Sequence, residues 1–219
     1  KVIPNGFDTH KFSPNQKFRK VLRKEINISE NSKLIGYFAR FDIQKNHFGF
    51  IKIASEIKSK YPNVYFVLAG SGIDYHNIIL LNWIDKFNLR SSFRLLGNRK
   101  DIHILNSALD LYLSPSYGEG FPNAIGEAMS CGVPCIATNV GDCKQIINDN
   151  NLISEVDNSE DLVNKVLMCL NWNQQEIKKQ SFLARQRIKN LFSIEKINQK
   201  YGEFYQKLFN NNYSYFEDI

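Results

Sequence analysis

The sequence predicts an α/β fold, in which a parallel sheet is covered by helices on both faces. Short apolar runs alternate with segments whose apolar residues recur at helical spacing, which favours strand–helix–strand units with right-handed crossovers. The apolar runs are continuous rather than alternating, as in strands that are buried on both faces. From Asp161 onward the pattern is entirely helical. Together these observations predict a Rossmann-like three-layer α/β/α sandwich of about six parallel strands, with carboxyl-terminal helices packing over it.

The expected elements follow one another at short intervals. The strands are expected at residues 34–40, 64–69, 93–96, 110–114, 135–138 and 152–156. The helices between them are expected at residues 48–60, 75–87, 102–108, 122–131 and 143–147, and the closing helices at 161–170, 174–191 and 194–209. Residues 2–12 are expected to be extended with a turn at Asn5-Gly6, and the polar, basic segment 13–31 to be a short helix or a loop.

Composition places the chain among globular proteins. The 219 residues leave room for one large domain or two small ones, and 43% hydrophobic residues can build a core. We find no repeat, low-complexity tract or linker, so we expect one domain over residues 1–209 and a tail at 210–219. The net charge of +6 comes from scattered residues, which leaves open a diffuse charge or a surface that approaches an anionic membrane.

Several classes of function are excluded by pattern. The aromatic residues lie inside the expected strands and helices, which is typical of a core and not of a surface that binds nucleic acid. No G-x-G-x-x-G follows the first strand, which argues against an oxidoreductase. Cys131 and Cys135 have no second cysteine pair or nearby histidine, so buried free thiols are favoured over a zinc site. We see no run as long as a membrane span and no signal peptide.

Ligands of open parallel sheets bind beyond the carboxyl ends of the strands, so the turns that follow the strands are candidate sites. After the first strand, Arg40 and Lys45 are able to pair with two phosphates, although they could also be exposed loop cations. The glycines of Gly70-Ser71-Gly72 allow a close approach of the backbone to a ligand, and the turn at 97–100 could frame a flat base. Neither of these two turns, at 70–72 and 97–100, would identify a binding site by itself.

The strongest signal lies at residues 114–138, where a strand, a glycine-rich turn, a helix and a second strand follow one another. The turn leaves backbone amides near the start of a helix, which attracts anions. Glu119 precedes this start, either as a capping charge or as an acceptor for sugar hydroxyls. Glu127 lies within the helix and is expected to be partly buried, where the hydroxyls of a ribose would supply donors; the alternative is a solvent-facing glutamate.

The segments VIPNGFD, GYFARFDIQKN, VLAGSG, FRLLG and EGFPNAIGEAMSCGVPCIAT occur in that order. Through these segments and their order, the chain resembles the carboxyl-terminal, nucleotide-sugar-binding domain of the GT-B glycosyltransferases, specifically glycosyltransferase family four. The resemblance covers residues 2–208, and Glu119 and Glu127 form the E-x7-E motif of that family.

The resemblance implies a role for each matching position. It implies that Arg40 and Lys45 hold the donor diphosphate, that Glu119 contacts the transferred sugar and that Glu127 binds the ribose hydroxyls. The resemblance implies two further groups of positions. The backbone of one group would surround the donor, and the other group would line the nucleotide pocket. The first group is Gly120, Phe121, Pro122 and Asn123, and the second is Gly72 and Arg99.

The resemblance also implies an enzyme class. It implies a retaining transferase of the hexosyltransferase type that uses a UDP- or GDP-sugar as co-substrate and needs no metal or other cofactor. Enzymes of this kind often build bacterial surface polysaccharide (lipopolysaccharide O-antigen, capsule or exopolysaccharide). We therefore expect a cytoplasmic setting or a peripheral one, where the inner membrane face would carry a lipid-linked acceptor.

The domain organisation implied by the resemblance has a second half. Residues 1–12 match the crossing between two domains, and the amino-terminal, acceptor-binding domain is absent from the sequence. The fragment alone is expected to bind donor weakly and to transfer little or no sugar. Two alternatives stay open: a non-catalytic Rossmann-like module that binds a nucleotide or phosphate, and a degenerate homologue with a regulatory role.

Overall fold

The computed structural model describes residues 2–213, and the side chains of residues 2–210. Six strands form one sheet in the order β3-β2-β1-β4-β5-β6, and all neighbouring strands are parallel. The strands are β1 (Lys33–Phe38), β2 (Val64–Ala69), β3 (Phe93–Leu95), β4 (Leu111–Ser114), β5 (Cys135–Thr138) and β6 (Ile153–Ser154). The predicted Rossmann-like parallel sheet is therefore confirmed.

Helices connect the strands and continue to the end of the described chain. Those between strands are α2 (His47–Lys60), α3 (Ile78–Lys86), α4 (Ile102–Ala108), α5 (Asn123–Ser130) and α6 (Cys143–Ile147). Helix α1 (Gln16–Glu25) precedes β1, and α7 (Ser159–Leu170), α8 (Gln174–Leu191) and α9 (Ile194–Tyr213) follow β6. Helix α3 begins three residues later than expected because the side chain of Asn77 caps it by accepting a hydrogen bond from Leu80 N.

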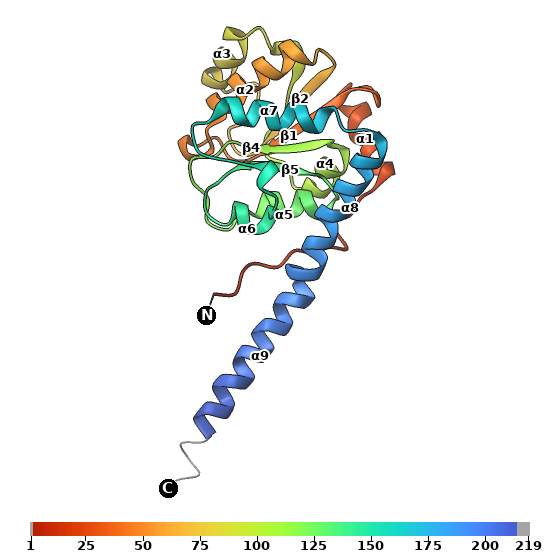
Figure 1. The fold of residues 1–219 in the computed structure, drawn as a ribbon. Coiled ribbons are helices and arrows are strands. Elements are labelled where there is room, and N and C mark those ends of the chain that lie inside the picture. Colours follow the sequence, from red (N-terminus) through yellow and green to blue (C-terminus); the bar gives the residue numbers. More distant parts are fainter. Residues whose placement is uncertain (1, 214–219) are drawn as a thin grey trace.

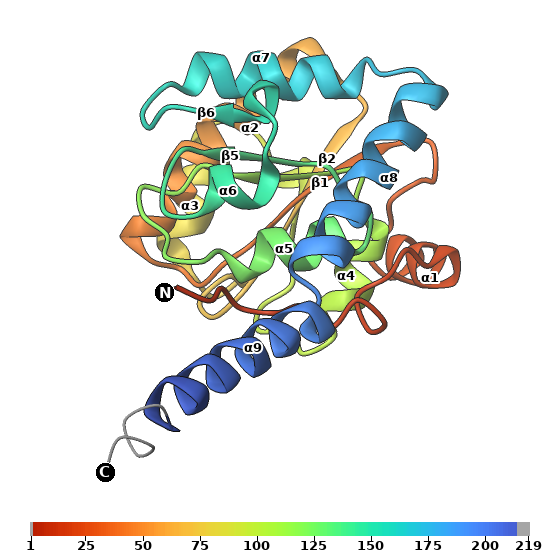
Figure 2. The same cartoon turned by 60° about the horizontal axis from the view of Figure 1, so that its bottom comes forward.

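The helices form two layers around the sheet (Figures 1 and 2). Helices α2, α3 and α7 lie on one face, and α1, α4 and α5 lie on the other, with α8 packed against α5. Strands β4 and β5 are buried at every position, as are most residues of β1 and β2. This burial explains why the strands appear in the sequence as continuous apolar runs.

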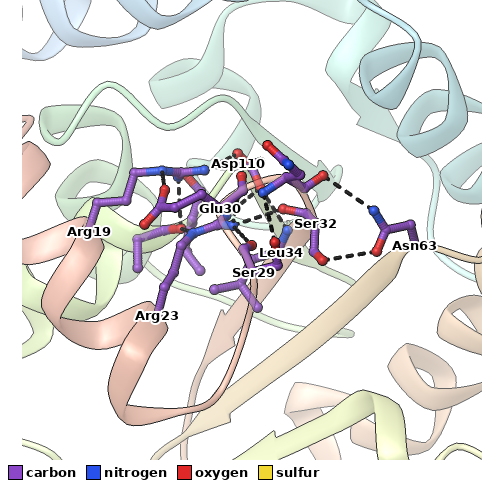
Figure 3. Close-up of polar contacts among 11 residues, drawn as sticks. Arg19, Arg23, Ser29, Glu30, Ser32, Leu34, Asn63 and Asp110 are labelled. Carbon is purple, nitrogen blue, oxygen red and sulfur yellow. Dashed lines mark hydrogen bonds and ion pairs between the residues drawn. The ribbon is translucent and has the colours of Figure 1, made fainter.

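Helix α1 is anchored to the amino-terminal edge of the sheet by two arginines (Figure 3). The guanidinium of Arg23 is 1% exposed and donates to Asp110 Oδ2 at 2.7 Å, and Arg19 donates to Asp110 Oδ1 at 2.9 Å. Arg23 also donates to the carbonyls of Ser29 and Ser32, both at 2.8 Å. Burial lowers the pKa of Arg23, and the charge of Asp110 opposes that shift. These contacts hold the segment that the sequence left open as helix or loop.

The amino-terminal segment runs beside the junction of α8 and α9. Phe7 N donates to Phe192 O at 2.8 Å and Ile194 N donates to Phe7 O at 3.0 Å, which forms a parallel bridge between Phe7 and Ser193. The ring of Phe7 packs on Gly126 of α5 so closely that a Cβ there would lie 2.0 Å from its nearest ring atom. A side chain at this position of α5 would displace the segment.

Helix α9 leads away from the body of the domain in both views (Figures 1 and 2). Helices α7 and α8 pack over the sheet and its neighbours, whereas α9 contacts α8 at its start. Helix α9 continues through residues 210–213, the first part of the expected tail, while residues 214–219 lie outside the described range. In the described part of the chain, every helix is too short or too polar to cross a membrane.

Candidate functional site

The turns that follow the strands are joined to one another at the carboxyl edge of the sheet. Phe41 N donates to Ser71 O at 2.8 Å, and Gly70 N donates to Gly97 O at 2.8 Å. Tyr117 N donates to Gln44 O at 2.7 Å, which joins the turn after β1 to the turn after β4. Strands β1 and β4 are neighbours at the point where the strand order reverses, and such a switch point leaves a crevice for a ligand.

Lys45 and Glu119 meet at this switch point. The Nζ atom of Lys45 lies 2.7 Å from Oε2 of Glu119, and the two side chains are only 16% and 12% exposed. A single 3₁₀ turn, Ile43–Lys45, carries the lysine; Asp42 caps it, and Asn46 ends it in the left-handed region at φ 50°. An asparagine tolerates that conformation better than most residues do. The two loops thus bring one predicted cation and one predicted carboxylate into direct contact.

Glu119 has a second partner on its other oxygen. Ser116, which is fully buried, donates to Oε1 of Glu119 at 2.8 Å, and the hydroxyl of Tyr37 lies 2.9 Å from Ser116 Oγ. Burial raises the pKa of Tyr37 above its usual value, so its hydroxyl keeps its proton. Ser116 opens a turn that the sequence selects as a candidate site, but its sequence context gives it no role of its own. Tyr37 has no such signal, because it lies in an apolar run that is typical of a buried strand.

The backbone of the turn at Glu119 and Gly120 is supported by the loop after β5. Asp142 N donates to Gly120 O at 3.0 Å. Gly141 has φ +50°, and a Cβ on it would lie 2.3 Å from the carbonyl oxygens of both Glu119 and Gly120. Only glycine leaves room for this approach. The sequence analysis missed Gly141, although it lies in a turn after a predicted strand and the same rule would have selected it.

The start of α5 presents free backbone amides beside this pair. The N-cap residue Pro122 has no side-chain acceptor for the first turn. Gly120 is exposed, and a Cβ there would meet no atom within 4 Å. The ring of Phe121 turns inward, stacking on Phe7 at 5.7 Å, and Asn123 accepts a hydrogen bond from Asn5 at 3.1 Å. The unpaired N–H groups and the helix dipole make this end suitable for an anion.

Glu127 is half-buried in α5, as the sequence predicts. Among residues 2–210, whose side chains the structure describes, no donor forms a hydrogen bond with its carboxylate. Burial raises its pKa to about 7, and the nearby charge of Lys11 opposes that shift. A partly desolvated carboxylate without a donor favours a ligand that supplies hydroxyl groups.

The other predicted residues are placed differently. Arg40 is mostly exposed and pairs with Asp42 at 3.1 Å, so the structure does not join it to Glu119. Gly72 has φ +75° and its carbonyl accepts from Asn77 at 2.7 Å. The guanidinium of Arg99 donates to both oxygens of Asp101 at 2.7 Å and to Glu25 at 2.6 Å. The hydrogen bonds to Asp101 and Glu25 raise the pKa of Arg99, so its guanidinium is already paired with two carboxylates.

Comparison with protein families gives one match that covers most of the chain. The family described as glycosyl transferases group 1 matches residues 18–186. A galactosyltransferase of Escherichia coli, UDP-Gal:alpha-D-GlcNAc-diphosphoundecaprenol alpha-1,3-galactosyltransferase, is 30% identical over 208 residues, which are 93% of this chain and 53% of that protein. The Escherichia coli O-antigen biosynthesis glycosyltransferase WclY is 26% identical, covering 96% of this chain and 55% of its own length. The chain thus spans about half the length of these relatives.

Solved structures agree with this assignment. A glycosyltransferase of Rickettsia africae has a TM-score of 0.86 at 24% identity, and Anabaena HepE in complex with UDP has a TM-score of 0.85 at 26% identity. They cover 96% and 94% of this chain, and 57% of each of those chains is covered in return. The separate C-terminal domain of a group 1 glycosyltransferase, LpcC from Francisella tularensis, has a TM-score of 0.73 at 22% identity and is covered completely, over 86% of this chain. The chain therefore belongs to the glycosyl transferases group 1 family, and its fold matches that of the C-terminal domain of such a glycosyltransferase.

Proposed function

We propose that this domain binds the nucleotide-sugar donor of a retaining, metal-independent glycosyltransferase of the hexosyltransferase type. One observation carries the proposal: Lys45 and Glu119 meet, 2.7 Å apart, beyond the ends of β1 and β4 and beside the open start of α5. A cation and free helix amides fit a diphosphate, and a carboxylate fits sugar hydroxyls. A nucleoside diphosphate sugar carries both groups in one molecule.

The positive groups have one role in this proposal. Lys45, Arg40 and the backbone N–H groups of Gly120, Phe121 and Asn123 bind the diphosphate and stabilise the charge that develops on it as the sugar leaves. Arg40 is exposed and held only by the neighbouring Asp42, so it can turn toward a ligand at little cost. Lys45 is already held beside Glu119, where the sugar would lie next to the diphosphate.

The carboxylates have two different roles. Glu119 accepts hydrogen bonds from hydroxyls of the transferred sugar, and Glu127 accepts them from the ribose. The absence of a donor to Glu127 among the described side chains of residues 2–210 supports the second role, since a half-buried carboxylate gains most from a ligand that brings donors. Gly72 and Arg99 would line the nucleotide pocket. Arg99 would contribute to this pocket through the backbone of its loop, because its guanidinium already forms ion pairs with Asp101 and Glu25.

The biological role that we propose is the synthesis of bacterial surface polysaccharide. The Escherichia coli relatives are named for galactosyl transfer to a diphosphoundecaprenol-linked sugar and for O-antigen biosynthesis. An acceptor with such a lipid would bring the enzyme to the inner face of the membrane, and the net charge of +6 is compatible with an anionic surface. Residues 1–209 would form the donor domain, and residues 1–12 would connect it to an acceptor-binding domain.

The direct test is a titration of the domain with UDP, GDP and ADP and with the corresponding nucleotide sugars. Binding is measured by calorimetry or by chemical-shift changes. We expect one nucleotide class to bind, and Glu127→Ala to weaken that binding by about tenfold or more, because it removes the ribose acceptor. The matched control is Glu56→Ala, an exposed glutamate in α2. The proposal is wrong if no nucleotide binds, or if both variants bind like the unsubstituted domain.

A further inference from the structure

We infer that the buried hydroxyls of Tyr37 and Ser116 are positioning groups, which hold Lys45 and Glu119 in the geometry that the transferred sugar requires. Neither hydroxyl reaches the ligand directly: Ser116 is fully buried and Tyr37 is 1% exposed. The inference rests on the proposed function, since it assigns to both residues an effect on donor recognition through the groups that touch the donor.

Ser116 fixes the orientation of the Glu119 carboxylate. Its hydroxyl donates to Oε1 at 2.8 Å, while Lys45 donates to Oε2 at 2.7 Å. Two donors on different oxygens stop the carboxylate from rotating about its last bond. The remaining lone pairs of both oxygens are then available to a ligand in a fixed direction.

Tyr37 connects this carboxylate to the loop that carries the lysine. Its hydroxyl donates to the carbonyl of Lys45 at 2.8 Å and lies 2.9 Å from Ser116 Oγ. The ring is stacked on Phe50 at 5.5 Å and tilted against His47 at 5.2 Å, which holds the hydroxyl in place. Burial lowers the pKa of His47 to about 4, so this imidazole is a neutral packing surface at pH 7. Tyr37, on β1, therefore holds the loops after both β1 and β4.

The number of hydroxyl hydrogens makes the arrangement more specific. A carbonyl and a carboxylate only accept, so Tyr37 must donate to Lys45 O, and Ser116 must donate to Glu119. The hydrogen of Ser116 belongs with Glu119, because the bond to a charged acceptor is the stronger one. The single hydrogen of Tyr37 is then shared between two acceptors, Lys45 O at 2.8 Å and Ser116 Oγ at 2.9 Å, as a three-centre hydrogen bond. Removing this one hydroxyl therefore loosens both loops together.

A loosened carboxylate would affect the sugar more than the nucleotide. Without the hydroxyl of Ser116, Glu119 keeps its ion pair with Lys45 and turns toward it, away from the direction set by two donors. Small misplacements of positioning groups cost up to about a hundredfold in the reactions that depend on them. UDP alone lacks the transferred sugar that Glu119 would contact, so its binding does not depend on this direction.

The test compares each variant in its affinity for UDP and for UDP-sugars, using UDP-galactose and UDP-glucose, with GDP and GDP-mannose as a second series. We expect Ser116→Ala and Tyr37→Phe to lower the ratio of sugar-nucleotide to nucleotide affinity by about tenfold. The matched control is Tyr112→Phe. Tyr112 is equally buried, and among the described residues its hydroxyl forms hydrogen bonds only with the backbone of Phe38, at 3.0 and 3.2 Å. We expect it to lose comparable stability and to keep the ratio within about twofold.

Each outcome decides between distinct claims. A lower ratio in the two variants with an unchanged ratio in Tyr112→Phe supports the inference. An unchanged ratio in Ser116→Ala and Tyr37→Phe overturns it and leaves the proposed function intact, as does an equal loss in the control, which would indicate general loosening of the core. If the unsubstituted domain binds UDP and UDP-sugars equally, the role of Glu119 at the sugar is wrong and the inference with it. Binding of no nucleotide at all would remove the proposed function too.

Discussion

The ammonium group of Lys45 lies 2.7 Å from a carboxylate oxygen of Glu119, although 74 positions separate the two residues in the chain. Strand order explains this contact. Strands β1 and β4 are neighbours. From β1 the chain continues toward the edge of the sheet formed by β3, and from β4 it continues toward the opposite edge, formed by β6. The turns after both strands therefore open at the same place, and each contributes one charge. The pair is mostly buried, so it should be worth more than a surface ion pair.

We expect Lys45→Met to destabilise the domain by on the order of 2 kcal/mol, because it leaves Glu119 buried without its cation. Adding Glu119→Gln should recover about half of that loss, since the unpaired charge is then removed. Urea unfolding of the two single variants and the double variant gives the coupling energy. Strictly additive effects would show that the two side chains do not interact in solution.

The raised pKa of Glu127 predicts a dependence of stability on pH. Burial raises this pKa from 4.5 to about 7, so the folded domain holds the proton more tightly than the unfolded chain does. Stability from this group is therefore present in full below about pH 4.5 and is lost as the pH rises to about 7, by about 3 kcal/mol. Glu127→Gln should remove this part of the slope between pH 4.5 and 7.5 in urea unfolding. The same slope in both proteins would contradict the burial of this carboxyl.

Ligand binding should show the opposite trend with pH. A ribose that donates hydrogen bonds favours the charged form of Glu127, so affinity should rise as the pH passes about 7. A nucleotide sugar is the better probe than a free nucleoside diphosphate, whose terminal phosphate itself titrates near pH 6. Calorimetry between pH 6 and 8 would measure the rise, and Glu127→Gln is expected to abolish it. A pH-independent affinity in the unsubstituted domain would argue against ribose at this carboxylate.

The arginine network at the opposite edge of the sheet predicts a large loss of stability. Asp110→Asn removes the charge that neutralises the buried guanidinium of Arg23, at a cost of about 3–5 kcal/mol. The matched control is Asp85→Asn, because Asp85 pairs with Arg90 in a surface contact in which both side chains are nearly half exposed. That change should alter the free energy of unfolding by less than about 0.5 kcal/mol. Equal effects in thermal or urea unfolding would refute the importance of burial.

Two helical glycines should respond to alanine in opposite directions. Gly126→Ala places a Cβ inside the ring of Phe7 and should destabilise the domain by about 1–3 kcal/mol. Gly202→Ala in α9 meets no atom within 4 Å and should stabilise its helix by up to about 1 kcal/mol. Melting temperatures would separate them, and adding Phe7→Leu to Gly126→Ala should restore part of the loss. A neutral Gly126→Ala would mean that the amino-terminal segment is not packed on α5.

The sheet and the position of the site could be predicted from the sequence because their signals are local. A buried parallel strand is a continuous apolar run, and the turn after it is rich in glycine and charged residues, as at residues 116–123. The partial burial of Glu127 followed from its place on a helix that packs against the sheet.

What the sequence could not provide was the direction of long or dual-purpose side chains. Arg40 and Arg99 both follow strands, yet one is exposed and the other is tied to two carboxylates, one of them on α1. Arg23 lies in a segment that appears polar and solvent-facing, yet it is almost fully buried. Burial is possible because each nitrogen of its guanidinium donates a hydrogen bond, either to a backbone carbonyl or to Asp110. Tyr37 resembles any aromatic core residue until the fold brings Ser116 to its hydroxyl.

The bridge between Phe7 and Ser193 has a mechanical consequence. It places two stretches of backbone, far apart in sequence, side by side in parallel where both leave the body of the domain. A neighbouring body attached through both stretches would be joined to this domain at two adjacent points of the backbone, and a movement of one stretch would therefore be passed to the other.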